Sequence, residues 1–324
     1  MTLVLSRCDV ARLLTLDECI GAVEAAFRLH GERRIAPPGI LGTHVAGGGF
    51  HIKTAILPLA RDYFAAKVNG NFPANGQRFG LPTIQGVVFL ADGRNGEPLA
   101  VMDSIEITVL RTGAATAVAA KHLAHVNSRV ATVCGCGNQG RIQLRALSRV
   151  LRLEKAFAWD LDVSRVRALA DELSAELGIE MESTEDLARA VPMSDVCVTC
   201  TPSHAPFLLR EQLRPGAFVA AVGSDSPDKQ ELDPSILSSG TVVVDVLDQC
   251  ATIGELHHAL EAGLMTREGV HAELGEIVAG RKSGRRSNDE TIVFDSTGTA
   301  LQDAAAAVLV YEKAIRDGIG FLMT

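Results

Sequence analysis

The 324-residue sequence has few aromatic residues, no excess of positive charge and no long apolar run. Aromatic residues make up 4% of the chain, so its core must consist mainly of aliphatic side chains. The 31 Lys and Arg residues against 39 Asp and Glu argue against nucleic-acid binding, because few cations are left to neutralise phosphates. A basic group at 281–286 is better explained as a solvated loop. No stretch approaches the ~20 apolar residues of a membrane span, so we expect no membrane association.

The sequence also lacks the signs of a secreted protein. Its first ten residues, MTLVLSRCDV, contain too few apolar residues before Arg7 for a signal-peptide core. Seven cysteines, an odd number scattered along the chain, indicate reduced thiols. We therefore expect a cytoplasmic protein.

The first third of the chain predicts a helix followed by a β-rich region. Thr15 and Glu18 form a T-x-x-E capping box, and apolar residues then follow at helical spacing. GGGFHIKTAIL, YFAAKVNGNF, TIQGVVFLAD and EPLAVMDS are typical of strands, the last two joined as a hairpin by a Gly-rich turn. An Ala-rich helix is predicted from Ile105 to His125.

From about residue 128, short apolar strands alternate with amphipathic helices. The strands are VATVCG, KAFAWD, IEME, SDVCVTC, AFVAAVG, TVVVDV and IVFDS, and a typical helix, 163–177, stops at Gly178. This alternation predicts right-handed βαβ units and a parallel sheet. A last helix is predicted over 299–316. The fold class is therefore α/β, a Rossmann-type doubly wound parallel sheet with a second, α+β domain.

A glycine-rich loop, GCGNQG, joins the first strand of this region to its helix. Such a loop lets the backbone approach a pyrophosphate, and the helix N-terminus supplies N–H groups and a positive dipole end. The sequence thus predicts dinucleotide binding through Gly135, Gly137, Asn138, Gln139 and Gly140.

The next strand ends in Asp160, at the position where this motif places a ribose-binding carboxylate. An acid there favours NAD, because it would repel the additional phosphate of NADP. NADP stays possible, since Arg165 is near enough in sequence to bind that phosphate.

The cysteines of this region could instead suggest a four-thiolate zinc site made of Cys134, Cys136, Cys197 and Cys200. However, Cys197 and Cys200 fall on a predicted strand, where a spacing of three puts side chains on opposite faces. Cys136 also lies inside the phosphate loop. We therefore predict no metal site.

Ligands of open α/β sheets bind at the carboxyl ends of the strands, where three further stretches fall. TCTPS offers Thr199 and Thr201, and FDSTGTA offers the small residues Ser296 and Gly298 beside a nicotinamide. VGSDSPDKQEL places Asp225 just beyond Gly223. The structural alternative for Asp225 is a helix N-cap.

Three cations interrupt apolar runs in the first third of the chain. Lys53 and Lys67 lie within predicted strands, and Arg111 lies near the start of the Ala-rich helix. Each could extend its charge to solvent. If they converge, they would suit a carboxylate substrate, which Arg can bind in bidentate fashion.

KVNGNFP, GLPTIQGVVFLAD, GEPLAVMD, ITVLRTGAATAVAA, GCGNQG, VGSD-x-P-x-KQEL and FDSTGTALQD, in this order, resemble the ornithine cyclodeaminase/mu-crystallin family. The resemblance spans about residues 10–315. It implies a discontinuous substrate-binding and dimerisation domain (1–115 with 300–324), a Rossmann domain (116–299), a homodimer and a nicotinamide cofactor. Its enzymes share hydride transfer between nicotinamide and the Cα of an amino acid or its imine.

The resemblance implies that Lys67 and Arg111 bind the substrate carboxylate, that Asp225 handles a proton at the substrate nitrogen, and that Asp225 and Lys67 are the catalytic residues. Cyclodeaminases of the family carry a Glu in the strand before this lysine. Between Gly47 and Lys67 the present chain has no Glu; it has His51 and Lys53, which we expect to contact substrate. A cation there would repel the distal ammonium of ornithine. Asp228, where a Gly is usual, is expected to change only a turn.

The sequence is compatible with three functions. The first is an NAD(P)-dependent amino-acid dehydrogenase or cyclic ketimine reductase, favoured by the missing Glu. The second is ornithine cyclodeaminase, which converts ornithine into proline and ammonia with catalytic NAD⁺. The third is a crystallin-like binding protein without catalysis, although Lys67, Arg111 and Asp225 are all retained.

Overall fold

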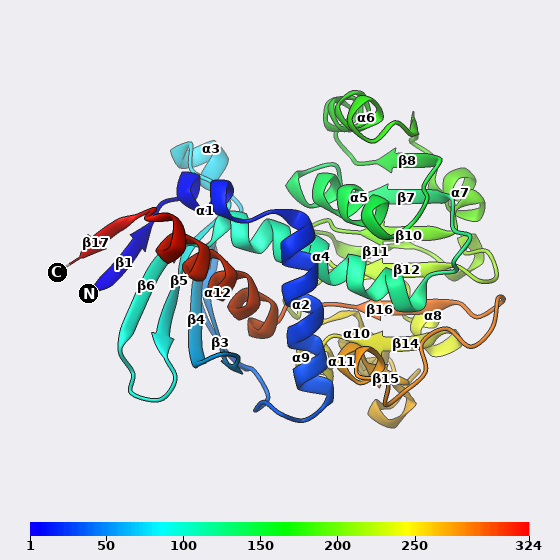
Figure 1. Cartoon of the computed structure of the whole chain (residues 1–324). Coiled ribbons are helices and arrows are strands. Elements are labelled where there is room, and N and C mark those ends of the chain that lie inside the picture. The colour runs from blue at the N-terminus through cyan, green and yellow to red at the C-terminus, as the bar shows by residue number, and fades with distance from the viewer. Residues whose placement is uncertain (324) are drawn as a thin grey trace. The chain divides into compact units, whose positions relative to one another are not determined.

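The computed structural model of the chain describes residues 1–323. It contains two large sheets, one built from strands with alternating apolar residues and one from strands with continuous apolar runs. Each sheet belongs to its own unit. The first unit comprises residues 1–114 and those from 299 onward, and the second comprises residues 115–298 (Figure 1).

The sheet of the first unit has seven strands in the order β17-β1-β6-β5-β4-β3-β2. Its pairs are antiparallel except β1 with β6. The strands are β1 (Thr2–Leu5), β2 (Gly39–Val45), β3 (Gly48–Pro58), β4 (Asp62–Asn71), β5 (Ile84–Asp92), β6 (Pro98–Asp103) and β17 (Phe321–Met323).

Helices of this unit are α1 (Arg7–Leu13), α2 (Leu16–Gly31), α3 (Asn75–Phe79) and α12 (Ala300–Asp317), and α4 (Ile105–Leu123) begins in it. Helix α2 starts as predicted, with the Thr15 side chain accepting from the backbone N–H of Glu18. Helix α12 packs on β3 and β4, and its run of buried alanines, Ala304 to Ala307, allows this close approach (Figure 1).

The two faces of this sheet differ because side chains alternate along each strand. Ala55, Leu57 and Leu90 are buried on the face that α12 covers. The opposite face is also apolar but much more exposed, and its side chains include Leu41, Phe50, Ile56 and Val87. We call these four residues the open apolar face.

The second unit contains eight parallel strands in the order β15-β14-β16-β12-β10-β7-β8-β9. The strands are β7 (Val130–Cys134), β8 (Lys155–Trp159), β9 (Glu180–Ser183), β10 (Val196–Thr199), β12 (Phe218–Ala221), β14 (Thr241–Val244), β15 (Ala272–Glu273) and β16 (Ile292–Asp295). β10, β12 and β16 are buried along their whole length, as their continuous apolar sequences require. The predicted fold class, a Rossmann-type parallel sheet with a second α+β unit, is confirmed.

The helices of the second unit are α5 (Asn138–Val150), α6 (Val163–Leu177), α7 (Leu187–Ala190), α8 (Pro234–Ser239), α9 (Leu247–Ile253), α10 (Glu255–Glu261) and α11 (Leu274–Val278). Helix α6 ends at Gly178, whose φ of 67° is the left-handed conformation that glycine adopts at low cost. The sequence analysis missed a small two-stranded sheet of β11 (His204–Leu208) and β13 (Gln230–Leu232).

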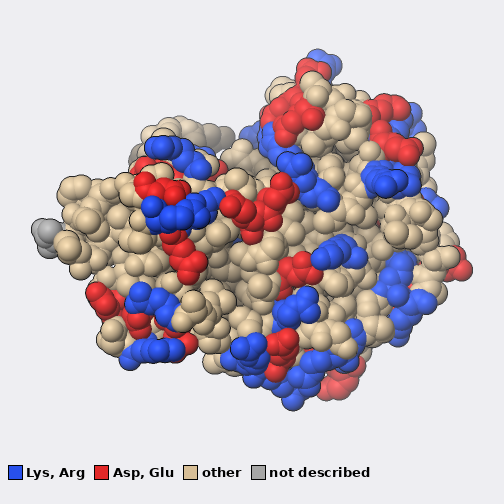
Figure 2. All heavy atoms as spheres, in the orientation of Figure 1, with Lys and Arg blue, Asp and Glu red and all other residues tan. Residues whose placement is uncertain are grey.

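Surface charge is mixed on the face shown in Figure 2, where acidic and basic side chains are interspersed. Within the basic group at 281–286, Arg286 pairs with Glu290 and Arg285 donates to the Leu123 carbonyl at 2.8 Å. No helix in the described part of the chain is both long and apolar enough to cross a membrane.

Candidate active site

The cations predicted in the first unit lie around one carboxylate. Lys67 on β4 donates from Nζ to Oδ1 of Asp303 on α12 at 2.7 Å. The Nε of Arg111 on α4 lies 2.9 Å from that same oxygen. Lys53 is the register partner of Lys67 on β3, and it too is buried. Two cations therefore share one oxygen of Asp303, which leaves positive charge for a further anion.

Gln302 extends this group. Its Oε1 accepts from Nη1 of Arg111 at 2.7 Å, and within the described residues its buried Nε2 has no hydrogen-bond partner. A buried amide donor without an acceptor is costly in a folded protein. Together with Lys67 and Arg111, Gln302 offers donors of the kind that a carboxylate accepts.

Burial controls the charge of Lys67. Desolvation and the neighbouring Arg111 lower the pKa of Lys67 to about 7, although Asp303 acts in the opposite direction. Lys67 and Arg111 in turn hold the pKa of Asp303 below its usual range despite its burial. Asp303 thus stays ionised while Lys67 can lose its proton near neutral pH.

His51 lies two residues before Lys53 on β3, so both side chains project from one face of that strand. His51 is the register partner of Asn69, whose Oδ1 accepts from Ser104 at 2.7 Å. All four residues predicted to bind substrate therefore lie in the first unit: His51, Lys53, Lys67 and Arg111.

In the second unit, the glycines of the phosphate loop meet different demands. Gly135 has a φ of 107°, and a Cβ on Gly140 would lie 2.0 Å from the Gly135 carbonyl oxygen. A Cβ on Gly137, in contrast, would meet no protein atom within 4 Å. Gly137 precedes Asn138 and Gln139 at the start of α5, whose N-terminus has no side-chain cap. The loop therefore offers open space and N–H groups to an anion.

Asp160 follows β8 and lies beside this loop. Its Oδ2 accepts from the backbone N–H of Cys136 at 2.7 Å, and its Oδ1 accepts from that of Asp162 at 3.0 Å. The acid predicted to bind ribose is thus held next to the loop predicted to bind phosphate.

The other predicted cofactor-binding residues follow further strands of the same sheet. Thr199 ends β10, and Thr201 and Gly223 both donate to Glu231, which the sequence analysis did not single out. After β16, Ser296 donates from Oγ to Oδ2 of Asp245 at 3.0 Å, and the Gly298 N–H donates to the same atom at 2.8 Å.

Asp225 lies in the turn that links β12 to β13. Its Oδ1 accepts from Nζ of Lys229 at 2.6 Å, and its side chain is 32% exposed. No helix starts after it before α8, whose N-cap is Asp233, so the alternative of a helix N-cap is wrong. The Lys229 contact holds the Asp225 carboxylate in a defined position within this turn.

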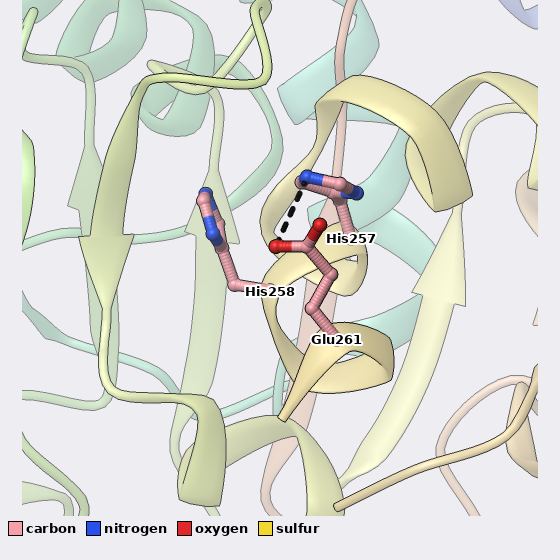
Figure 3. Close-up of side chains that lie close together, drawn as sticks. All are labelled: His257, His258 and Glu261. Carbon is pink, nitrogen blue, oxygen red and sulfur yellow. Dashed lines mark ion pairs between the residues drawn. The ribbon is translucent and has the colours of Figure 1, made fainter. Parts of the chain in front are cut away.

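The cysteines are all free thiols. Cys200 lies just beyond β10 and not on the strand as predicted, and its thiol donates to the Cys134 and Gly135 carbonyls at 3.3 Å each. Among the described residues, one group has metal-ligand types close together: His257, His258 and Glu261 on α10 (Figure 3). Within this group His257 pairs with Glu261, and outside it His258 contacts the Lys229 carbonyl.

Sequence reasoning missed Asp303 and Gln302, although both occur in the FDSTGTALQD stretch. The feature of the sequence that could have identified them is a pair of polar residues inside an Ala-rich helix. In the structure both side chains are buried, with 1% exposed. The buried acids Glu231, Glu255 and Asp295 were not predicted as site residues either.

A Rossmann-type sheet with a glycine-rich loop, joined to a unit with buried cations, defines the class of two-unit α/β dinucleotide-binding proteins. The chain belongs to the ornithine cyclodeaminase/mu-crystallin family, whose model matches residues 1–318.

Three solved structures of other proteins are similar to this chain over nearly its whole length. An archaeal alanine dehydrogenase dimer with bound NAD is 38% identical, with a TM-score of 0.95 over 100% of this chain and 99% of that chain. The Δ1-pyrroline-2-carboxylate reductase of Thermococcus litoralis, in complex with NADH and L-proline, is 34% identical, with a TM-score of 0.94 over 99% and 100%. The iminosuccinate reductase of Paracoccus denitrificans, in complex with NAD⁺, is 34% identical, with a TM-score of 0.89 over 99% and 98%.

Proposed function

We propose that this protein is an NAD-dependent oxidoreductase that transfers hydride between nicotinamide and the Cα of a small amino acid or its imine. It would act as an amino-acid dehydrogenase or a ketimine reductase. The observation that carries this proposal is the buried Lys67–Arg111 pair on one Asp303 oxygen, in a chain that also has the phosphate loop. The named activities of the three relatives support the same reaction type.

The substrate carboxylate would bind Lys67, Arg111 and Gln302. Arg111 offers a planar guanidinium and Lys67 a compact charge, and both are already desolvated. Binding there would orient the neighbouring Cα, because a carboxylate held by two or three donors has little rotational freedom.

The residues of the second unit fit a dinucleotide. The space beside Gly137 and the uncapped start of α5 suit its pyrophosphate, and Asp160 suits an adenosine ribose that carries no 2′-phosphate. When bound, the nicotinamide supplies or accepts the hydride. Thr199, Thr201, Gly223, Ser296 and Gly298 are proposed to line the rest of that site.

Asp225 would move the proton. Losing hydride from Cα requires a neutral amine, so a carboxylate base must first remove a proton from the ammonium. In the reverse direction Asp225 would return that proton to the nitrogen, which balances the charge of the arriving hydride. Its ion pair with Lys229 would hold the carboxylate in place.

The substrate side chain is proposed to be neutral or acidic. His51 and Lys53 lie where a cyclodeaminase of the family carries a Glu, and a cation there would repel the second ammonium of ornithine. Ornithine cyclodeaminase activity is therefore the alternative outcome of the test below.

The first unit is proposed to bind substrate and to form a homodimer through its open apolar face. Exposed apolar patches of this kind mark contact surfaces. The relative described as an alanine dehydrogenase dimer supports the same arrangement. The cytoplasm is the proposed compartment, because all seven cysteines are free thiols.

The decisive experiment incubates the purified protein with a panel of carboxylates and both cofactors while NADH absorbance and ammonia are followed together. The panel holds pyruvate with ammonium or methylamine, oxaloacetate with ammonium, Δ1-pyrroline-2-carboxylate and ornithine. Stoichiometric loss of NADH with an imine or with a 2-oxo acid plus amine is expected. Ammonia released from ornithine without net change in NADH would replace the proposal with cyclodeaminase activity, and no turnover at all would leave a crystallin-like binding protein.

A further inference from the structure

Four acidic side chains are buried at the carboxyl ends of the parallel strands in the second unit: Glu231, Asp245, Glu255 and Asp295. All are at most 1% exposed. Buried carboxylates must be hydrogen-bonded, and here most of the donors are backbone N–H groups of neighbouring segments. The four side chains therefore tie separate loops of one sheet edge together.

Glu231 ties the two loops that the proposed cofactor site needs most. Its Oε1 accepts from the backbone N–H and the Oγ1 of Thr201, at 2.6 and 2.8 Å. Its Oε2 accepts from the backbone N–H of Gly223 at 3.0 Å. One carboxylate thus bridges the loop after β10 to the loop after β12, which continues into Asp225.

The backbone of Glu231 is itself fixed from behind. Glu255, at the start of α10, accepts from the N–H groups of Glu231 and Leu232 at 2.7 and 3.2 Å. Asp295, at the end of β16, accepts in turn from the N–H groups of Glu255 and Leu256 at 3.2 and 2.9 Å. The three carboxylates form a chain of contacts from β16 through α10 to β13.

The turn that carries Asp225 is held to the same helix. The Lys229 carbonyl accepts from Oγ of Ser224 at 2.8 Å and lies 2.7 Å from Nε2 of His258. The ion pair drawn in Figure 3 joins Glu261 to His257, while His258 makes this contact with the Lys229 carbonyl. Helix α10 thus contacts the end of the 223–231 segment, at Lys229 and Glu231, and Ser224 links the start of the segment to Lys229.

We propose that Glu231 is a positioning residue that sets the spacing of Thr201, Gly223 and the Asp225 turn for cofactor binding, and that Glu255 and Asp295 hold Glu231 in place. The inference rests on the proposed function, because it assumes that these loops contact the dinucleotide. Close packing supports it: a Cβ on Gly223 would lie 2.4 Å from Oε2 of Glu231, so only glycine lets the carboxylate reach that N–H.

The test compares Glu231→Gln with Asp195→Asn. Glutamine keeps the shape of Glu231 but replaces one acceptor oxygen with an N–H₂ group. That group would face the backbone N–H of Thr201 or of Gly223, which is also a donor. Asp195 is the matched control: it also accepts from two backbone N–H groups, those of Arg129 and Val130, but at the amino end of the strands. Hydrogen–deuterium exchange, melting temperature and NADH affinity by fluorescence titration are measured for both variants.

For Glu231→Gln we expect faster hydrogen–deuterium exchange that is confined to residues 199–203 and 222–232. We also expect the Kd for NADH to rise about tenfold, which corresponds to the loss of roughly one charge-assisted hydrogen bond. For Asp195→Asn we expect a lowered melting temperature with an NADH Kd within about twofold of the unmodified protein. Should Glu231→Gln not fold, Glu255→Gln is measured instead and should give the same local exchange with a smaller rise in Kd.

Equal effects of Glu231→Gln and Asp195→Asn on NADH affinity, or exchange that rises uniformly over the unit, would overturn the positioning role and leave only a contribution to stability. Failure of the proposed function has a separate signature. The unmodified protein would then not bind NADH or turn over any member of the panel, while the local exchange effect of Glu231→Gln would still be observed.

Discussion

At the scale of single residues, the buried Lys67 connects substrate binding to pH. Its pKa is lowered to about 7 by desolvation and by Arg111, so the free protein loses this charge as the pH rises above 7. A bound carboxylate adds negative charge and must raise the pKa of Lys67 again. Binding above pH 7 therefore takes up a proton.

The affinity for a carboxylate is thus expected to fall as pH rises, by up to about tenfold per pH unit above neutrality. Calorimetric titration with a carboxylate inhibitor, in two buffers of different ionisation enthalpy, measures both the affinity and the proton uptake. The Lys67→Arg variant serves as the control, because arginine stays charged and its affinity should not depend on pH in this range. If the unmodified protein also binds the inhibitor tightly with an affinity that does not change with pH, Lys67 is not the group that loses its charge near pH 7.

Asp225 allows a second prediction at this scale. Asp225→Asn removes the proton acceptor while keeping the size of the side chain, so turnover should fall by about 10²–10⁴-fold. NADH affinity should change by less than about threefold, because the phosphate loop is untouched. Asp228→Asn, an exposed neighbour in the same turn, should keep its activity. Comparable losses in both variants would show that the turn, and not the Asp225 carboxylate, is what turnover requires.

At the scale of elements, local pattern predicted most helices and strands, because the apolar period changes where antiparallel strands give way to βαβ units. The glycines of the phosphate loop were predictable for the same reason, as they follow a strand and open a helix. The contacts of Asp303 and Glu231 were not predictable. Lys67 and Asp303 are 236 residues apart, and no local pattern tells which distant side chain a buried cation meets.

Two substitutions in the phosphate loop, at Gly140 and at Gly137, distinguish an effect on packing from an effect on ligand binding. Gly140→Ala should lower the melting temperature, because its Cβ would lie 2.0 Å from the Gly135 carbonyl oxygen. Gly137→Ala should leave that temperature within a few degrees, because its Cβ meets no protein atom. NADH affinity should nevertheless fall for Gly137→Ala, since the methyl group occupies space proposed for the pyrophosphate. Unchanged NADH binding by Gly137→Ala would place the pyrophosphate elsewhere.

At the scale of the whole molecule, the open apolar face predicts association of two copies. Leu41 is 59% exposed and Phe50 44%, on a sheet that carries α12 on its other face only. Exposed apolar side chains gathered on one face of a sheet tend to be buried by a partner in solution. We expect light scattering to give the mass of a dimer.

The double variant Leu41→Glu, Phe50→Glu should be monomeric, because two like charges from each copy would face one another across a desolvated contact. Val126→Glu is the control, as Val126 is 82% exposed in the second unit and lies outside this face. A dimer that survives the double variant would assign subunit contact to another surface.

The pairing of β1 with β17 has a consequence for the order of folding during synthesis. Thr2 is aligned with Met323, so the sheet of the first unit gains β17 only after residue 323 has been translated. Helix α12, which covers that sheet and supplies Asp303, is also made late. The second unit is continuous in sequence and can form its own sheet earlier. Because β1 and β17 are neighbouring strands, a short engineered peptide could join Met323 to Thr2, and this residue range could be opened instead at an exposed turn.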